Sequence, residues 1–408
     1  MKILVVSHLF PNENNPNYGI FMARQVEEMA RQGMDITVIV PMVWAPPILT
    51  RFKRWKSYDH NVKISRFEGL KTVAAPYLRI TGNWFYQWNG LFVYWALKKI
   101  ARRLHQKEKY DIIYARSFFP DGDAIVRLGR YLKLPTVCVG IGRDINIIPH
   151  YSKAIYNRFV KTANALDGTI ASGKAVADKI DAVSGKTTLS VYGVVNLEKF
   201  VPVPDKSAIR KELGLPVDKV IVLYLSSFKK DKGVYELLQA FLQISREHEN
   251  AELRICGAGV EKQGMIDFIQ KNDDRKSMHM MGSVEYNHVN RWMQACDLFI
   301  LPTYHEGMPN AVMEAMACGL PVVASAVGGL PEAVGDSDGA LLVPAQDVKA
   351  LKDAMDKVVS DAPLRQKMAA AARQRAEERF GVGRTASTII DYLKQIKAQH
   401  HNPKQDRL

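Results

Sequence analysis

The residues best suited to chemistry lie in one short segment, where two glutamates stand eight positions apart at Glu306 and Glu314. The apolar run 298–303 before this segment predicts a buried strand, and the run 310–318 predicts a helix that ends at Gly319. Carboxylates on either side of a strand-to-helix turn can accept hydrogen bonds from the hydroxyl groups of a ligand. The segment is therefore a candidate binding site for a hydroxylated molecule.

The start of the predicted helix suits a phosphate group. We expect Pro309 at the first helical position, where a missing N–H costs nothing, and Met308 at the cap. The methionine side chain has no oxygen to accept from the N–H groups of Asn310 and Ala311, so this N-terminus can hold an anion. A diphosphate bound there would place its sugar near the first glutamate and its ribose near the second. The alternative is an ordinary strand, turn and amphipathic helix with two surface glutamates.

Strands and helices alternate along the whole chain, a pattern that is typical of parallel sheets covered on both faces. In the first half we expect strands at 2–9, 35–40, 62–67, 111–115, 136–140 and 168–172. In the second half we expect strands at 220–226, 252–256, 278–281, 298–301, 321–324 and 340–343.

The run 197–205, which contains two prolines, breaks this rhythm and predicts a linker between two domains. We therefore expect an α/β protein with two doubly wound, Rossmann-like domains that face each other across a cleft, spanning residues 1–196 and 205–380. The last helix, at about 382–408, can pack back on the first domain. Ligands of such sheets bind at the carboxyl ends of the strands.

The composition is that of a globular chain long enough for two domains, with 408 residues, 47% hydrophobic and 24% charged. The four cysteines lie in or beside apolar runs without disulfide or metal spacing, which predicts reduced core thiols. No basic segment followed by an apolar one precedes the first strand, so we expect no secretory signal and a cytoplasmic location.

Net charge divides unevenly between the two halves. Residues 1–200 contain 29 Lys and Arg against 15 Asp and Glu, whereas residues 201–408 contain 27 of each. Residues 51–110 alone contain 14 basic and 3 acidic side chains. The first domain is therefore expected to face an anionic partner.

An aromatic and then basic stretch lies within this charged part of the chain. At helical spacing it carries one stripe of apolar residues: Trp84, Trp88, Leu91 and Trp95. Such a stripe is either a core face packed on the sheet or an interfacial helix on anionic lipid, with the basic run 98–103 toward headgroups. The basic aromatic stretch 44–56 favours contact with the inner face of the plasma membrane. Nucleic acid is the other anionic partner, but no nucleic-acid motif accompanies the charge.

The segment from Glu306 to Glu314, with the run Ala-Met-Ala-Cys-Gly-Leu-Pro-Val-Val that follows it, resembles the nucleotide-sugar site of family 4 retaining glycosyltransferases, which have the GT-B fold. The resemblance covers nearly the whole chain. Ser7-His-Leu-Phe-Pro and Asn17-Tyr-Gly-Ile-Phe21 are most similar to the teichuronic-acid and exopolysaccharide branch of that family.

The resemblance implies roles for particular residues. It places Lys232 on the donor diphosphate, together with an arginine five positions earlier, where this chain has Ser227. Either Lys229 or Lys230 would have to compensate for the missing cation. The implied donor-binding residues are Gly19, Lys232, Val284, Glu306, Gly307, Met308, Pro309, Asn310, Ala311 and Glu314.

Two further positions have two interpretations each. Gly19 either approaches the diphosphate or is a plain turn glycine, and Asp144 either approaches the sugar or acceptor or caps a loop. Asp144, Glu306 and Lys232 are the implied catalytic residues. The motif Gly257-Ala-Gly259 lacks the third glycine of a dinucleotide site and predicts only a close strand-to-helix turn.

The resemblance implies a retaining glycosyltransferase that moves a sugar from a nucleotide-sugar donor to a glycan or polyprenyl-linked acceptor. No Asp-x-Asp pair stands at an expected strand end, so we expect no obligatory metal and no cofactor. Two rival interpretations are another GT-B enzyme, such as an epimerase or phosphorylase, and a non-catalytic protein that binds nucleotide sugars.

Overall fold

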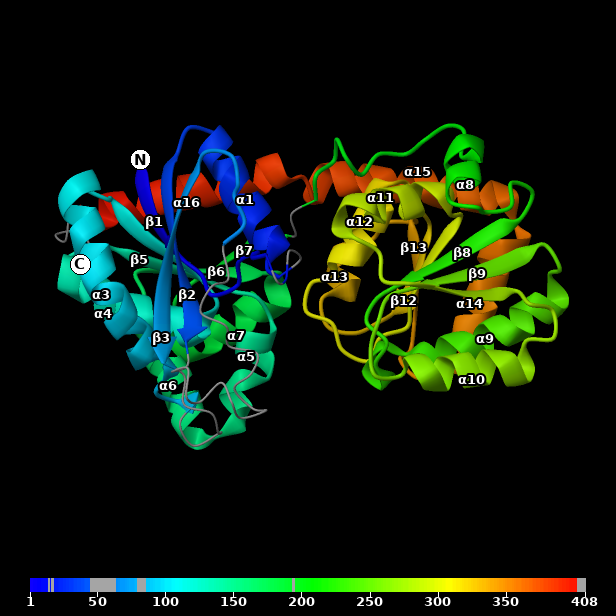
Figure 1. Ribbon diagram of the computed structural model, residues 1–408, viewed down its shortest axis with the longest axis horizontal. Coiled ribbons are helices and arrows are strands. Elements are labelled where there is room, and N and C mark those ends of the chain that lie inside the picture. The colour runs from blue at the N-terminus through cyan, green and yellow to red at the C-terminus, as the bar shows by residue number, and fades with distance from the viewer. Residues whose placement is uncertain (14, 16–17, 45–63, 79–85, 193–194, 402–408) are drawn as a thin grey trace. The chain divides into compact units, whose positions relative to one another are not determined.

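The computed structural model describes residues 1–13, 15, 18–44, 64–78, 86–192 and 195–401. The chain forms two compact units, an N-terminal unit of Met1–Val191 with Val382–Leu408 and a C-terminal unit of Tyr192–Gly381 (Figure 1). The boundary lies at 191/192, earlier than the predicted linker at 197–205. Within that run Phe200 is fully buried in the core of the C-terminal unit, so the segment belongs to that unit.

The N-terminal unit is a doubly wound sheet of seven parallel strands in the order β3-β2-β1-β4-β5-β6-β7. Its strands are β1 (Lys2–Val6), β2 (Asp35–Trp44), β3 (Leu70–Leu78), β4 (Ile112–Arg116), β5 (Thr136–Gly140), β6 (Gly168–Ser172) and β7 (Leu189–Val191). Its helices are α1 (Ile20–Arg31), α3 (Asn89–Glu108), α4 (Asp123–Leu132), α5 (Arg143–Asn146), α6 (Lys153–Ala165), α7 (Lys174–Ser184) and α16 (Val382–His401).

Each face of this sheet has its own hydrophobic core. Alternate strand residues point to opposite faces, so Val5 packs with α1 and α16, while Leu4 packs with α3, α4, α6 and α7. The last helix of the chain thus lies against α1 within the N-terminal unit. The prediction of a strand at 62–67 is wrong, because the third strand is β3, and residues 64–67 form only an isolated bridge at Ile64. Residues 62 and 63 lie outside the described residues.

Helix α3 does not use its tryptophans as a core face. The residues that it buries include Val93, Leu97 and Ala101, at intervals of four, whereas Trp88 and Trp95 are 44% and 58% exposed. The core interpretation of the aromatic stripe is therefore wrong for these two residues. Trp84 and the stretch 45–56 lie outside the described residues.

The C-terminal unit is a second doubly wound parallel sheet, of six strands in the order β10-β9-β8-β11-β12-β13. Its strands are β8 (Val220–Leu225), β9 (Ala251–Cys256), β10 (Met278–Gly282), β11 (Leu298–Leu301), β12 (Val322–Ser325) and β13 (Ala340–Val343). Its helices are α8 (Ser207–Glu212), α9 (Val234–Glu247), α10 (Lys262–Asn272), α11 (Tyr286–Ala295), α12 (Asn310–Ala317), α13 (Leu330–Val334), α14 (Val348–Ser360) and α15 (Ala362–Arg379).

One hydrophobic core joins this sheet to its helices, with α9 packed on α14 and α12 on α15. The glycines of the 257–259 turn are required by close approach, as predicted. A Cβ atom on Gly257 would lie 1.9 Å from the Ser226 carbonyl oxygen, and one on Gly259 would lie 2.2 Å from that of Phe228. The four cysteines are buried free thiols.

Candidate functional site

The candidate site lies where the strand order of the C-terminal unit reverses. Strands β8 and β11 are neighbours in the sheet, but β9 continues outward from β8 and β12 outward from β11. Lys232 follows β8 and Glu306 follows β11. The Lys232 ammonium donates to Glu306 Oε2 at 2.7 Å, and both side chains are 21% exposed. Sheet topology thus brings together a cation and a carboxylate at the place where doubly wound sheets bind ligands.

The two loops that carry this pair are tied together by their backbones. The Tyr304 N–H donates to the Asp231 carbonyl oxygen at 2.8 Å, and the buried Thr303 hydroxyl lies 3.2 Å from the same oxygen. Gly233, at φ +68°, ends the lysine loop, and a Cβ atom there would lie 1.9 Å from the Pro302 carbonyl oxygen. Only glycine fits this contact, which holds Lys232 beside the end of β11.

Helix α12 begins without a side-chain cap. Asn310 is its first residue and Pro309 is the cap, one position later than predicted, with φ −82° and ψ 89°. Met308 therefore lies outside the helix. The end is as predicted, since Gly319 adopts φ +66° and the N–H of Leu320 returns to the Ala315 carbonyl oxygen. The first amides of α12 retain the orientation that suits an anion.

Glu314 is buried inside the first turns of α12. The side chain is only 7% exposed, and its Oε1 accepts from the Tyr286 hydroxyl at 3.2 Å. Burial raises the pKa of Glu314 to about 7, against the hydrogen bond from Tyr286 and the charge of Lys199, which lower it. The ammonium of Lys199 lies 4.7 Å from the centre of the Tyr286 ring. Glu314 is thus a carboxyl group whose charge depends on pH near neutrality.

A second glycine pair packs against the Glu306 loop, and the sequence alone did not identify this role. A Cβ atom on Gly328 would lie 1.8 Å from the Glu306 carbonyl oxygen, and one on Gly329 would lie 2.0 Å from that of Gly307. The Gly329 N–H also donates to the Glu306 carbonyl oxygen at 3.3 Å. The loop after β12 therefore sets the backbone position of Glu306.

The remaining donor-site candidates of this unit are Val284 and the residues near Ser227 on the lysine loop. Val284 lies between β10 and α11 and packs its side chain partly against the core. Ser227 lies two residues after the end of β8, and its carbonyl oxygen accepts from the Lys229 N–H at 3.0 Å. Lys229 and Lys230 lie on the same loop as Lys232, so either is near enough in sequence to serve the lysine site. Their compensation for Ser227 stays a prediction.

Gly19 and Asp144 lie in the N-terminal unit and have structural contacts. Gly19 caps α1 at φ +69°, and a Cβ atom there would lie 2.4 Å from the Leu9 carbonyl oxygen. The buried Asp144 accepts from the N–H of Phe118 at 2.8 Å and from those of Ile141 and Gly142 at 3.0 Å. These contacts explain Asp144 as a loop cap, and its approach to a sugar or acceptor stays a prediction.

The corresponding reversal of the N-terminal sheet, between β1 and β4, carries a pair that sequence reasoning missed. His8 follows β1, and its Nδ1 lies 2.8 Å from Oδ2 of Asp121, which follows β4 and is fully buried. The backbone of the adjacent Ser117 has φ +104°, which is rare for a residue with a side chain. From the sequence, His8 is expected inside the strand 2–9, and the motif that contains it serves only for the resemblance, whereas β1 ends at Val6.

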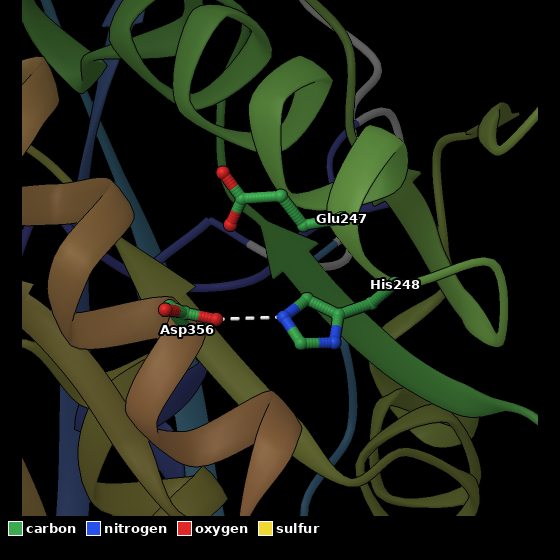
Figure 2. Close-up of side chains that lie close together, drawn as sticks. All are labelled: Glu247, His248 and Asp356. Carbon is green, nitrogen blue, oxygen red and sulfur yellow. Dashed lines mark hydrogen bonds and ion pairs between the residues drawn. The ribbon is translucent and has the colours of Figure 1, made fainter.

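In the described parts of the chain, the only group of three or more side chains with metal-ligating atoms close together is formed by Glu247, His248 and Asp356 (Figure 2). His248 Nε2 lies 2.6 Å from Asp356 Oδ1, and Glu247 lies beside them. The ammonium of Lys352 already binds Glu247 at 2.7 Å and lies 3.6 Å from Asp356. These side chains form an ion-pair network in which Lys352 already supplies the positive charge. Among the described helices, none is both long and apolar enough to cross a membrane.

Known proteins resemble this chain in sequence and fold. It is 26% identical to TuaC of Bacillus subtilis, a glycosyltransferase assigned to teichuronic acid biosynthesis, over 95% of this chain and 97% of that protein. Sucrose-phosphate synthase from Thermosynechococcus elongatus superposes with a TM-score of 0.78, at 20% identity, over 98% and 99% of the two chains. Anabaena HepE in complex with UDP-glucose superposes with a TM-score of 0.71, at 20% identity, over 97% and 100%.

The superpositions identify the two doubly wound units as a GT-B fold. Residues 205–375, which contain every donor-site candidate of the C-terminal unit, match the family described as glycosyl transferases group 1. Together with the similarity to TuaC over nearly the full chain, this match confirms the family that the segment from Glu306 to Glu314 implied. Residues 205–375 therefore carry the match to glycosyl transferases group 1, and the chain as a whole is similar to a glycosyltransferase over 95% of its length.

Proposed function

We propose that this enzyme is a retaining hexosyltransferase of cell-surface polysaccharide biosynthesis, which uses a nucleotide-sugar donor and a glycan or lipid-linked acceptor. The observation that carries the proposal is the pairing of Lys232 with Glu306 at the strand-order reversal, beside the uncapped start of α12. The UDP-glucose bound to HepE supports the donor class, and the role assigned to TuaC supports the pathway class.

The leaving group of this reaction is a nucleoside diphosphate, on which negative charge develops as the glycosidic bond breaks. Lys232 would exchange its contact with Glu306 for a phosphate oxygen, and the N–H groups of Asn310 and Ala311 would donate to another. Charged and preorganised donors of this kind stabilise developing charge more than they stabilise the ground state. Lys232 and the start of α12 would therefore lower the barrier to bond breaking.

The two glutamates would then hold opposite ends of the donor. Glu306, released by Lys232, would accept hydrogen bonds from sugar hydroxyls, and the buried Glu314 would accept from ribose hydroxyls. Because burial favours the neutral form of Glu314, its ionised form becomes stable only when donors replace the lost water. Ribose hydroxyls, with Tyr286, are such donors.

Retention of configuration would follow from a front-face displacement, in which the leaving phosphate takes the acceptor proton. Neither Glu306 nor Glu314 is required as a covalent nucleophile in this scheme. The proposal needs no divalent cation, because Lys232 and the helix amides supply the positive charge. Equal rates in chelator and in magnesium would support this part, and activation by magnesium would contradict it.

On the acceptor side we propose that the N-terminal unit binds the glycan or lipid-linked acceptor and docks reversibly on an anionic membrane. The support is the charge excess of residues 51–110 together with the exposure of Trp88 and Trp95. Aromatic rings and basic side chains on one surface suit the interface between lipid headgroups and acyl chains.

The decisive experiment begins with a thermal-shift screen of nucleotide sugars, followed by a transfer assay with the donor that stabilises most. Transfer by wild type, its loss in Glu306→Gln, and full activity of the exposed control Glu249→Gln would support the proposal. NMR of the product anomer tests retention. Interconversion of the nucleotide sugar without an acceptor would favour an epimerase. Donor binding without any reaction would favour the non-catalytic protein, for which the missing arginine at Ser227 is the one sequence argument.

A further inference from the structure

A basic groove lies between helices α4 and α6 of the N-terminal unit, outside every residue used above. Its volume is ≈ 440 Å³. The charged side chains that line it are Arg127 and Arg130 from α4, Arg158 and Lys161 from α6, and Asp123 at the start of α4. The groove therefore has four cations against a single carboxylate, and its net charge suits an anion.

Asp123 holds two of these cations without using up their hydrogen-bond donors. Its Oδ1 lies 3.7 Å from Arg127 and 3.8 Å from Arg158, too far for a hydrogen bond. The Arg127 and Arg158 side chains are 32% and 26% exposed, so both are partly withdrawn from water, and charged contacts are stronger away from water. Two guanidinium groups held in this way can bind phosphate oxygens in the bidentate geometry that arginine favours.

Two of the residues that line the groove also bury polar atoms. Asp123 is 5% exposed, and its Oδ2 has no hydrogen-bond partner among the described residues, like the buried Nε atom of Arg127. A Cβ atom on Gly90 would lie 2.2 Å from this Oδ2, so the start of α3 closes that side of the carboxylate. The arginines and not the carboxylate therefore provide the accessible polar surface.

These two helices, and helix α3 that packs on α4, carry exposed aromatic rings. Tyr131 of α4, Tyr156 of α6 and Trp95 of α3 are 37%, 41% and 58% exposed. The Lys98 ammonium lies 4.7 Å from the centre of the Tyr131 ring, which adds a cation beside the groove helices. Exposed aromatic rings on the helices that carry a cationic groove suit a surface that meets lipid headgroups, whereas a free inorganic anion would not require them.

We infer that the α4–α6 groove binds the phosphate of an anionic lipid headgroup and is the specific contact through which the N-terminal unit docks on a membrane. The inference rests on the proposed membrane contact and assigns it to residues outside the aromatic stretch 44–56. Arg127 and Arg158 bind the phosphate, and Arg130 and Lys161 add charge along the groove.

The test compares two double variants of equal charge loss by vesicle co-sedimentation without substrates. Arg130→Gln with Lys161→Gln removes groove charge and leaves both ion pairs of Asp123 in place. Arg31→Gln with Lys394→Gln removes the same charge from α1 and α16, on the opposite face of the sheet. With phosphatidylglycerol in phosphatidylcholine vesicles, we expect the groove variant to lose about tenfold or more in binding and the control at most about threefold.

The possible outcomes distinguish phosphate binding in the groove from membrane docking of the N-terminal unit as a whole. Equal losses in both variants would show a diffuse charge effect and overturn the groove while the membrane contact stands. Absence of wild-type binding to anionic vesicles, with stabilisation by inorganic phosphate that the groove variant loses, would overturn the lipid assignment. Arg127→Gln with Arg158→Gln, checked for folding by circular dichroism, should lose as much binding as the first groove variant. Transfer to a soluble acceptor tests the proposed enzyme activity independently of every vesicle result.

Discussion

The buried carboxyl group of Glu314 makes the stability of the C-terminal unit depend on pH in a way that one substitution should remove. The pKa of Glu314 is raised from 4.5 to about 7 by burial. Between these values the folded chain retains a proton that the unfolded chain has released. The contribution of this proton to the free energy of unfolding is therefore complete below about pH 4.5 and is lost as pH rises through about 7.

The size of this effect follows from the difference between the two pKa values. One pKa unit corresponds to about 1.4 kcal/mol, so the full contribution is about 3 kcal/mol, of which about 2–3 kcal/mol is lost between pH 5 and pH 8. Glu314→Gln has nearly the same shape, can accept from Tyr286, and does not titrate. We expect the variant to gain stability relative to wild type by this amount as pH rises from 5 to 8.

Hydrogen exchange of the α12 amides measures the effect, reported as opening free energies at each pH so that the intrinsic exchange rate is divided out. The matched control is Glu285→Gln, which removes a carboxylate that is 82% exposed. It should follow wild type at both pH values. A constant difference between wild type and Glu314→Gln across this range would refute the reasoning, because it would mean that the buried carboxyl group is ionised throughout.

The protonation of Glu314 should also make the affinity for nucleotide depend on pH. If ribose hydroxyls donate to ionised Glu314, a bound nucleoside diphosphate lowers the pKa of this group, and affinity increases as pH rises through about 7. The ratio of wild-type to Glu314→Gln affinity, measured by calorimetry, cancels the titration of the ligand itself. A ratio independent of pH would remove Glu314 from the ribose site and leave the stability argument intact.

Three further predictions concern the site itself. Glu306→Ala should lower transfer strongly with an unchanged far-ultraviolet circular dichroism spectrum, because it lies in a loop, and wild-type rates would remove it from the mechanism. Lys232→Ala should weaken nucleoside diphosphate binding by about 1.5–3 kcal/mol in calorimetry; unchanged affinity with a loss in Lys229→Ala would move the cation to the neighbouring lysine. Gly233→Ala should lower the free energy of unfolding by at least about 1–2 kcal/mol because of the left-handed backbone alone, and the clash with Pro302 should lower it further. The melting temperature should therefore fall. An unchanged melting temperature would show that the loop shifts freely.

Local signals in the sequence were sufficient for the segment that led to the family. An apolar run, a turn and a helix stopped by Gly319 are short-range features, and α12 ends where they predict. Its first residue was misplaced by one position, because sequence signals locate the end of a helix only to within one or two residues. The third strand was placed at 62–67 instead of Leu70–Leu78, since β3 lies at the sheet edge and is only partly buried, with little hydrophobic periodicity.

Alternation of strands and helices along the sequence also determined that the chain has two doubly wound units. The order of strands in each sheet, however, depends on long-range pairing, and that order places Lys232 2.7 Å from Glu306 across 74 positions of sequence. Burial was likewise decided by packing, which left Trp95 exposed and enclosed Glu314. A side chain's type records what chemistry it can do, whereas its solvent exposure and its partners depend on which distant residues fold against it.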